Sequence, residues 1–175
     1  FELRRRGQTV HLANFSFTSQ HELKDAVRVN DNLIGVTADQ KSELTYFPEL
    51  YLSQWFREKR SEEVTIWCFQ KTGVRPLLDS YQELIEHLAI DGILLIDGGV
   101  DSLMQGDEAQ TGTLIEDSIS LAAVKELKQI PLRLVACIGF GAELDMAYSH
   151  VFENIAALTQ SGNFFGSCSL LKPME

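Results

Sequence analysis

The sequence contains little cysteine and little positive charge, and each shortage excludes a class of protein. Its 175 residues include 3 cysteines, and 15 lysines and arginines stand against 25 aspartates and glutamates. Because Cys68, Cys137 and Cys168 lie far apart, we expect neither a disulfide framework nor a cysteine metal site. The net charge of -10 argues against a nucleic acid partner, because binding to a phosphate backbone requires a face of lysine and arginine.

Long hydrophobic runs are also absent. No stretch approaches the roughly 20 apolar residues that span a bilayer, and the first residues lack the charged and then apolar pattern of a signal peptide. We therefore expect no membrane partner and a cytoplasmic location. With 45 % apolar and 23 % charged residues, the composition is typical of a globular protein that folds without disulfides.

Short apolar runs predict a sheet. Residues 64–69, 92–97 and 132–140 are almost continuously apolar, which is typical of strands buried on both faces of a parallel sheet. Residues 33–38 and 164–171 are weaker candidates for strands. We expect the three main strands to be parallel neighbours whose carboxyl ends share one crevice.

Helical spacing of apolar residues appears between these runs. It predicts helices over 77–88, 115–127 and 148–158, and Pro48 favours the start of another helix. Alternating strands and helices predict an α/β fold. We expect one domain over residues 1–175, a Rossmann-like three-layer arrangement with a mostly parallel sheet.

The amino-terminal residues resemble the end of a helix. Phe1 to Arg6 are followed by Gly7, a typical helix-ending residue, and then by the strand-like residues 9–14. This pattern predicts that the first strand of the domain precedes the sequence. The apolar edge left by that strand favours self-association, so we expect a homo-oligomer.

In open α/β sheets, ligands bind outside the carboxyl ends of the strands. The most informative segment there begins at Asp97, where a carboxylate is followed by two glycines and further acids. Asp97 and Asp101 are predicted to be catalytic together with His150, and a divalent cation such as Mg²⁺ is predicted on Asp97, Asp101 and Asp107. The alternative is structural: the two glycines form a tight turn, and Thr113 and Glu116 form a capping box.

Ligand-binding roles are predicted for residues at three strand ends. Lys71 follows a strand directly, where it is placed to meet an anionic group or to pair with Asp97. Gly139 and Gly141 partly match a dinucleotide-binding fingerprint, although the third glycine is missing. The predicted ligand-binding residues are Lys71, Gly98, Gly99, Ser102, Asp107, Glu108, Gly139 and Gly141.

The sequence resembles the prokaryotic domain-of-unknown-function family number eleven fifty-two. The most specific likeness lies in the segment from Asp97 to Leu103 and in residues 106–108, 112–113 and 116–117. The likeness to that family covers most of the chain, because it extends to residues 46–49, 139–141, 150, 153–155 and Gly166. Members typically begin with a strand and a glycine-rich loop ending in Asp, and this sequence starts after that point. Residues 142–146 differ from the family pattern. The resemblance implies no established reaction, but it favours one shared site for the glycines and the acids.

The leading hypothesis is an enzyme, such as a metal-assisted hydrolase or transferase, that acts on a small polar or phosphorylated metabolite in an acid-lined pocket. One alternative is a non-catalytic module that binds a nucleotide or sugar in the same place. Another is a structural subunit of an oligomer. An enzyme requires titratable groups within hydrogen-bond reach of one another, whereas an assembly subunit presents large apolar patches.

Overall fold

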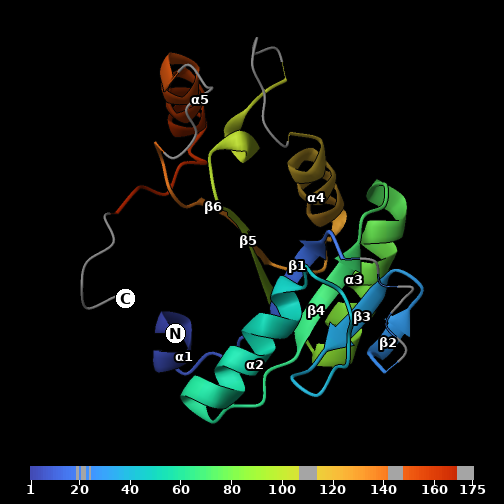
Figure 1. Ribbon diagram of the computed structural model, residues 1–175. Coiled ribbons are helices and arrows are strands. Elements are labelled where there is room, and N and C mark those ends of the chain that lie inside the picture. The colour runs from blue at the N-terminus through green and yellow to red at the C-terminus, as the bar shows by residue number, and fades with distance from the viewer. Residues whose placement is uncertain (19, 21–22, 24, 107–113, 142–147, 169–175) are drawn as a thin grey trace.

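The computed structural model describes residues 1–18, 20, 23, 25–106, 114–141 and 148–168 (Figure 1). Within these ranges, the strands form a four-stranded sheet in the order β1-β4-β3-β2 and a two-stranded sheet of β5 and β6. The strands are β1 (Leu12–Ser16), β2 (Val27–Asn30), β3 (Leu33–Val36), β4 (Ile66–Gln70), β5 (Gly92–Asp97) and β6 (Leu132–Cys137). The α/β class predicted from the sequence is therefore confirmed.

The arrangement of the strands differs from the single, mostly parallel sheet that the sequence predicts. β1 is parallel to β4 and β5 is parallel to β6, but β3 runs antiparallel to both β2 and β4. The reversal comes from the two-residue turn at 31–32, where the Asn32 amide donates to Asn30 Oδ1 over 2.8 Å, and such a turn joins only antiparallel strands. The prediction that β4, β5 and β6 are neighbours in one sheet is wrong for β4. The described residues 164–168 also contain no strand.

The helices follow the sequence patterns more closely. They are α1 (Glu2–Arg5), α2 (Pro48–Arg60), α3 (Val74–Leu88), α4 (Leu114–Glu126) and α5 (Tyr148–Gln160), with a 3-10 turn η2 (Asp101–Leu103). Gly7 has a φ of 83°, which confirms that a glycine in the left-handed region follows the opening helix. No helix among the described residues is long and apolar enough to cross a bilayer.

Helices cover both faces of the four-stranded sheet. Phe47 and Leu50, at the start of α2, pack against Ile66 and Cys68 on one face of β4. Leu77 and Leu84 of α3 pack on the opposite face, against the alternate residues Trp67 and Phe69. The alternation of side chains along β4 therefore gives three layers, with all four of these β4 residues buried.

The two-stranded sheet is covered differently. Ile93 and Leu95 of β5 pack against a cluster from α3 and α4 that includes Ile85 and Val124. The alternate residues Leu94 and Ile96 are 42 % and 61 % exposed. Among the described residues, the expected burial of this strand on both faces is therefore wrong, because one face lies against helices and the other is exposed.

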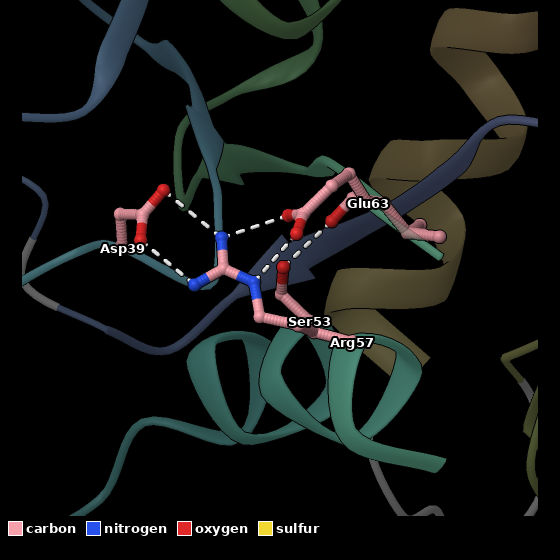
Figure 2. A network of polar contacts seen from close by, with 5 residues as sticks. Asp39, Ser53, Arg57 and Glu63 are labelled. Carbon is pink, nitrogen blue, oxygen red and sulfur yellow. Dashed lines mark hydrogen bonds and ion pairs between the residues drawn. The ribbon is translucent and has the colours of Figure 1, made fainter. Parts of the chain in front are cut away.

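Arg57 joins three segments at the edge of the sheet where β4 begins (Figure 2). Its guanidinium makes two bonds to Asp39, of 2.7 and 2.9 Å, and two to Glu63, of 2.7 and 2.8 Å. One turn earlier in α2, Ser53 Oγ donates to the Val64 carbonyl over 2.6 Å. The guanidinium holds the pKa of Asp39 below its usual range, mainly through these hydrogen bonds. The network therefore fixes α2 to the loops beside β3 and β4.

Arg57→Lys is expected to lower the free energy of unfolding, because an ammonium group cannot bind two carboxylates in a bidentate manner. Because the folded-state pKa of Asp39 is depressed, its contribution is present above the ordinary aspartate pKa and is lost as the pH falls through the folded value. Urea denaturation at neutral and acidic pH measures both effects. Arg75→Lys, at an exposed position of α3, is the control. Equal effects of the two variants at neutral pH would contradict a stabilising role for the network.

Candidate functional site

The carboxyl ends of β1 and β4 meet at one edge, because the two strands are parallel and Ser16 pairs with Gln70 in the register. Lys71, directly after β4, bonds Glu116 in the first turn of α4 over 2.7 Å. This bond places the start of α4, the helix that follows β5, at the same edge. We call this region the carboxyl edge.

A buried carboxylate organises the end of β1. Glu49, in the first turn of α2, is 3 % exposed. Its Oε1 accepts hydrogen bonds from Asn14 Nδ2 at 2.7 Å and Ser16 Oγ at 2.5 Å, and its Oε2 accepts one from Thr18 Oγ1 at 3.1 Å. The Thr18 amide also donates to Ser16 Oγ over 3.0 Å. Three neutral donors thus replace the water that a buried carboxylate loses.

The sequence analysis did not identify Glu49 as a candidate site residue. Two features of the sequence could have indicated this cluster. An acid stands in the first turn of the helix that begins at Pro48, and an earlier strand ends in the polar residues Asn14 and Ser16. Hydrogen bonding across about 30 residues is not a local pattern, so the sequence alone did not connect these positions.

Gln20 and Cys68 lie beneath this cluster. Gln20 is 1 % exposed and its Nε2 donates to the Cys68 carbonyl over 2.9 Å. Burial, followed by the nearby charge of Glu49, raises the pKa of the Cys68 thiol far above its usual range. The thiol therefore remains protonated, and it behaves as a small apolar group rather than as a nucleophile.

Lys71 lies where the sequence predicted it, at the end of β4, but its ion-pair partner is Glu116. The expected pairing with Asp97 rested on adjacency of β4 and β5, and these strands belong to different sheets. Lys71 Nζ also lies 3.4 Å from the ring centroid of Phe17, so it joins the end of β1 to α4. The hydrogen bond from Lys71 lowers the pKa of Glu116, which keeps that carboxylate charged.

Two buried polar atoms at this edge have no hydrogen-bond partner within the described part of the chain. They are Gln20 Oε1 and Thr72 Oγ1, both inaccessible to solvent although they lie in a polar region. Buried polar atoms are nearly always paired with protein, water or a ligand. The carboxyl edge therefore retains unused hydrogen-bonding capacity next to Glu49 and Lys71.

Asp97 holds its own turn together. Its Oδ1 accepts from the Gly99 amide at 2.7 Å and its Oδ2 from the Ser102 amide at 2.9 Å. Ser102 Oγ lies 3.2 Å from Cys137 Sγ, which links the turn to the end of β6. A side-chain carbon on Gly98 would meet no heavy atom of the described residues within 4 Å. These contacts match the tight-turn alternative for the two glycines.

The other predicted residues that the structure describes lie in η2, in α5 and in the turn after β6. Asp101 is 3 % exposed at the start of η2. His150, on α5, has a side chain that is 55 % exposed and an Nδ1 atom 3.6 Å from Glu153. Gly139 and Gly141 have φ angles of 86° and 93°, as expected for a turn after β6. Asp107, Glu108 and Thr113 lie outside the described residues.

Metal binding therefore stays a prediction. Within the described ranges, no group of three or more His, Cys, Asp or Glu side chains is arranged to hold a metal ion. Asp97 directs both of its oxygens at backbone amides, and the third predicted ligand, Asp107, is not among the described residues.

Comparison with known proteins identifies one family. The model of the family described as "Protein of unknown function (DUF1152)" matches residues 18–174, and the chain belongs to this family. This confirms the resemblance noted from the sequence. No curated protein and no solved structure matches the chain.

Asp97→Asn is expected to lower the free energy of unfolding by about 1 to 2 kcal/mol, because one carboxylate acceptor becomes an amide donor that faces a backbone N–H. Asp91→Asn, one residue before β5 and exposed, is the control and should change stability by less than about 0.5 kcal/mol. Urea denaturation measures both variants. If millimolar Mg²⁺ stabilises the wild type but not Asp97→Asn, the carboxylate is a metal ligand, and the purely structural role is contradicted.

Proposed function

We propose that this member of the DUF1152 family binds a small, polar, hydroxyl-bearing metabolite at the carboxyl edge, between the ends of β1 and β4 and the start of α4. One observation carries the proposal: buried polar atoms of Gln20 and Thr72 lack protein partners among the described residues, next to side chains fixed by Glu49 and Lys71. The location agrees with the general position of ligands in α/β sheets.

The charges at this edge favour hydroxyl groups over a phosphate. Lys71 is already neutralised by Glu116 at 2.7 Å, and Glu49 is a second carboxylate nearby. A phosphate brought to Lys71 would have to displace Glu116 or bring a cation with it. Sugar and nucleoside hydroxyls instead both donate to and accept from groups of this kind. A pentose or a nucleoside is therefore the ligand class that the described residues fit best.

The same residues favour binding over catalysis. Asp97 is engaged by the backbone of its own turn, His150 is exposed on α5, and the Cys68 thiol is held protonated. An acid or base must lie within hydrogen-bond reach of its substrate. Catalysis by Asp97, Asp101 and His150, with or without a metal, stays a prediction that also involves Asp107 and Glu108. We accordingly place the non-catalytic sugar- or nucleoside-binding module ahead of the enzyme.

The proposal is tested with Thr72→Val, which replaces the hydroxyl by a methyl group of nearly equal volume. The melting temperature of the free protein should stay the same or rise, because the hydroxyl has no partner among the described residues. The probes are ribose, adenosine and their 5′-phosphates, each with and without millimolar Mg²⁺. At least one neutral probe should raise the melting temperature of the wild type. Thr72→Val should weaken that binding about tenfold, which corresponds to one lost hydrogen bond.

Thr65→Val, before the opposite end of β4, is the matched control and should bind the probe as the wild type does. Stabilisation by the phosphates only in the presence of Mg²⁺ would favour the metal-assisted hypothesis instead. An unchanged affinity in Thr72→Val, or no response to any probe, would contradict the proposed site.

A further inference from the structure

A hollow of about 430 Å³ lies between α4 and β6. It forms because α4 lies over β5 and covers β6 incompletely. Leu95 of β5 packs against the cluster that contains Val124 of α4, whereas Val135, the partner of Leu95 in the β6 register, is 45 % exposed. The volume is within the range of pockets that bind small molecules, so the hollow is large enough for a ligand.

Apolar side chains from both sides form the floor of the hollow. Val135 points toward α4, because it lies two residues after Arg133, whose guanidinium bonds the carboxyl end of that helix. Leu121 lines the hollow from α4 itself. The apolar lining residues are Leu95, Leu121, Val124, Leu134 and Val135. An apolar chain placed here would be removed from water, which favours its binding.

Three cations, Lys125, Lys128 and Arg133, line the hollow at the carboxyl end of α4. Arg133 is held in place because its Nη1 donates to the carbonyls of Lys125 and Leu127, over 3.0 and 3.2 Å. Lys128 Nζ donates to the Lys125 carbonyl over 3.0 Å and lies 3.7 Å from Glu126. Within the described part of the chain, no carboxylate forms an ion pair with Lys125 or Arg133. Two positive charges are therefore uncompensated there, although the net charge of the chain is -10.

Capping of α4 explains only part of this arrangement. Cations commonly bond the last carbonyls of a helix and interact favourably with its dipole, which accounts for the bonds of Arg133 and Lys128. A carbonyl accepts a hydrogen bond but does not neutralise a charge, so Arg133 keeps its charge and its remaining N–H donors. The ammonium group of Lys125 makes no hydrogen bond among the described residues, and capping does not explain the apolar hollow beside it.

We propose that the hollow binds a small amphipathic carboxylate, with its charged group at Lys125 and Arg133 and its apolar chain over Leu121 and Val135. A bare anion such as phosphate would leave the apolar floor in contact with water. An uncharged apolar molecule would leave the two cations unpaired. A guanidinium group binds both oxygens of a carboxylate, so an aliphatic carboxylate matches both parts of the hollow.

This site is separate from the carboxyl edge. Glu116, which bonds Lys71 there, is in the first turn of α4, whereas Lys125 is in the last turn, about 14 Å further along the helix axis. The proposal therefore does not rest on the function proposed above, and either one can fail without the other.

Calorimetric titration at neutral pH and low salt tests the two parts of the ligand. The probes are octanoate, 1-octanol, which has the same chain length without the charge, and acetate, which has the charge without the chain. Octanoate should bind at least tenfold more tightly than either. Lys125→Gln should weaken octanoate binding about threefold, as expected for an exposed ion pair, and should not change the binding of octanol. Lys59→Gln, in the last turn of α2 and also exposed, is the matched control and should bind octanoate as the wild type does.

Val135→Trp tests the position of the apolar chain, because the larger side chain would fill the hollow. It should lower the affinity for octanoate at least tenfold. Leu132→Trp, an odd number of residues away and hence on the opposite face of β6, should retain the wild-type affinity. The melting temperature shows whether each variant is folded, and Lys125→Gln decides the question if Val135→Trp does not fold.

Three results would overturn the proposal: no heat from octanoate, equal affinities for octanoate and octanol, or an octanoate affinity that neither Lys125→Gln nor Val135→Trp lowers. Equal losses in Val135→Trp and Leu132→Trp would also overturn it, because the chain would then bind elsewhere. A dimer of the free protein that sedimentation detects and that Val135→Trp abolishes would count against it as well, because a second copy would then occupy the hollow.

Discussion

The buried carboxylate of Glu49 is the interaction on which the carboxyl edge depends. Removing an ionised group from water costs several kcal/mol unless hydrogen bonds replace the water. Asn14, Ser16 and Thr18 supply those bonds, so the last residues of β1 cannot move independently of α2. The same constraint fixes Phe17, which lies between two of the donors and against the ammonium group of Lys71. Lys71 in turn holds the first turn of α4 through Glu116.

Charged groups are used differently at the two ends of β4. At the end where the strand begins, Arg57 neutralises two carboxylates that are themselves 81 % and 68 % exposed. Those ions remain hydrated, so the network braces α2 without altering the interior. At the other end, the carboxylate of Glu49 is enclosed, and buried polar atoms of Gln20 and Thr72 lie without partners among the described residues. Because of this contrast, we assign a structural role to the ion pairs where β4 begins and ligand binding to the carboxyl edge.

Local patterns in the sequence predicted the local structure well. The runs at 92–97 and 132–140 contain the parallel pair β5 and β6, and Pro48 does begin a helix. The prediction was weakest where structure depends on distant residues. The polar segment before β3 gave no periodic signal, so the hairpin that makes β3 antiparallel was missed. The exposure of Ile96 was also missed. An apolar run indicates that a strand is suited to burial, but it does not show whether another element covers the strand.

The candidate site shows the same division. The sequence located the ends of β4 and β5, and it assigned Lys71 to the site, because position relative to a strand is a local property. It did not identify Glu49, whose role comes from donors about 30 residues away, and it gave Asp97 a catalytic role although its oxygens bond the amides of its own turn. A carboxylate after an apolar strand has the same local appearance in both roles, so only its partners distinguish them.

The central claim is that the charge of Glu49 orders the end of β1. Its most direct test is the exchange rate of the Thr18 amide, which donates to Ser16 Oγ within the cluster, in the wild type and in Glu49→Gln. Glu58→Gln, at an exposed position of the same helix, is the control. The account predicts that the Thr18 amide exchanges at least tenfold faster in Glu49→Gln, about 1.4 kcal/mol of lost local stability, and at the wild-type rate in the control. The same exchange rate in all three proteins would contradict it.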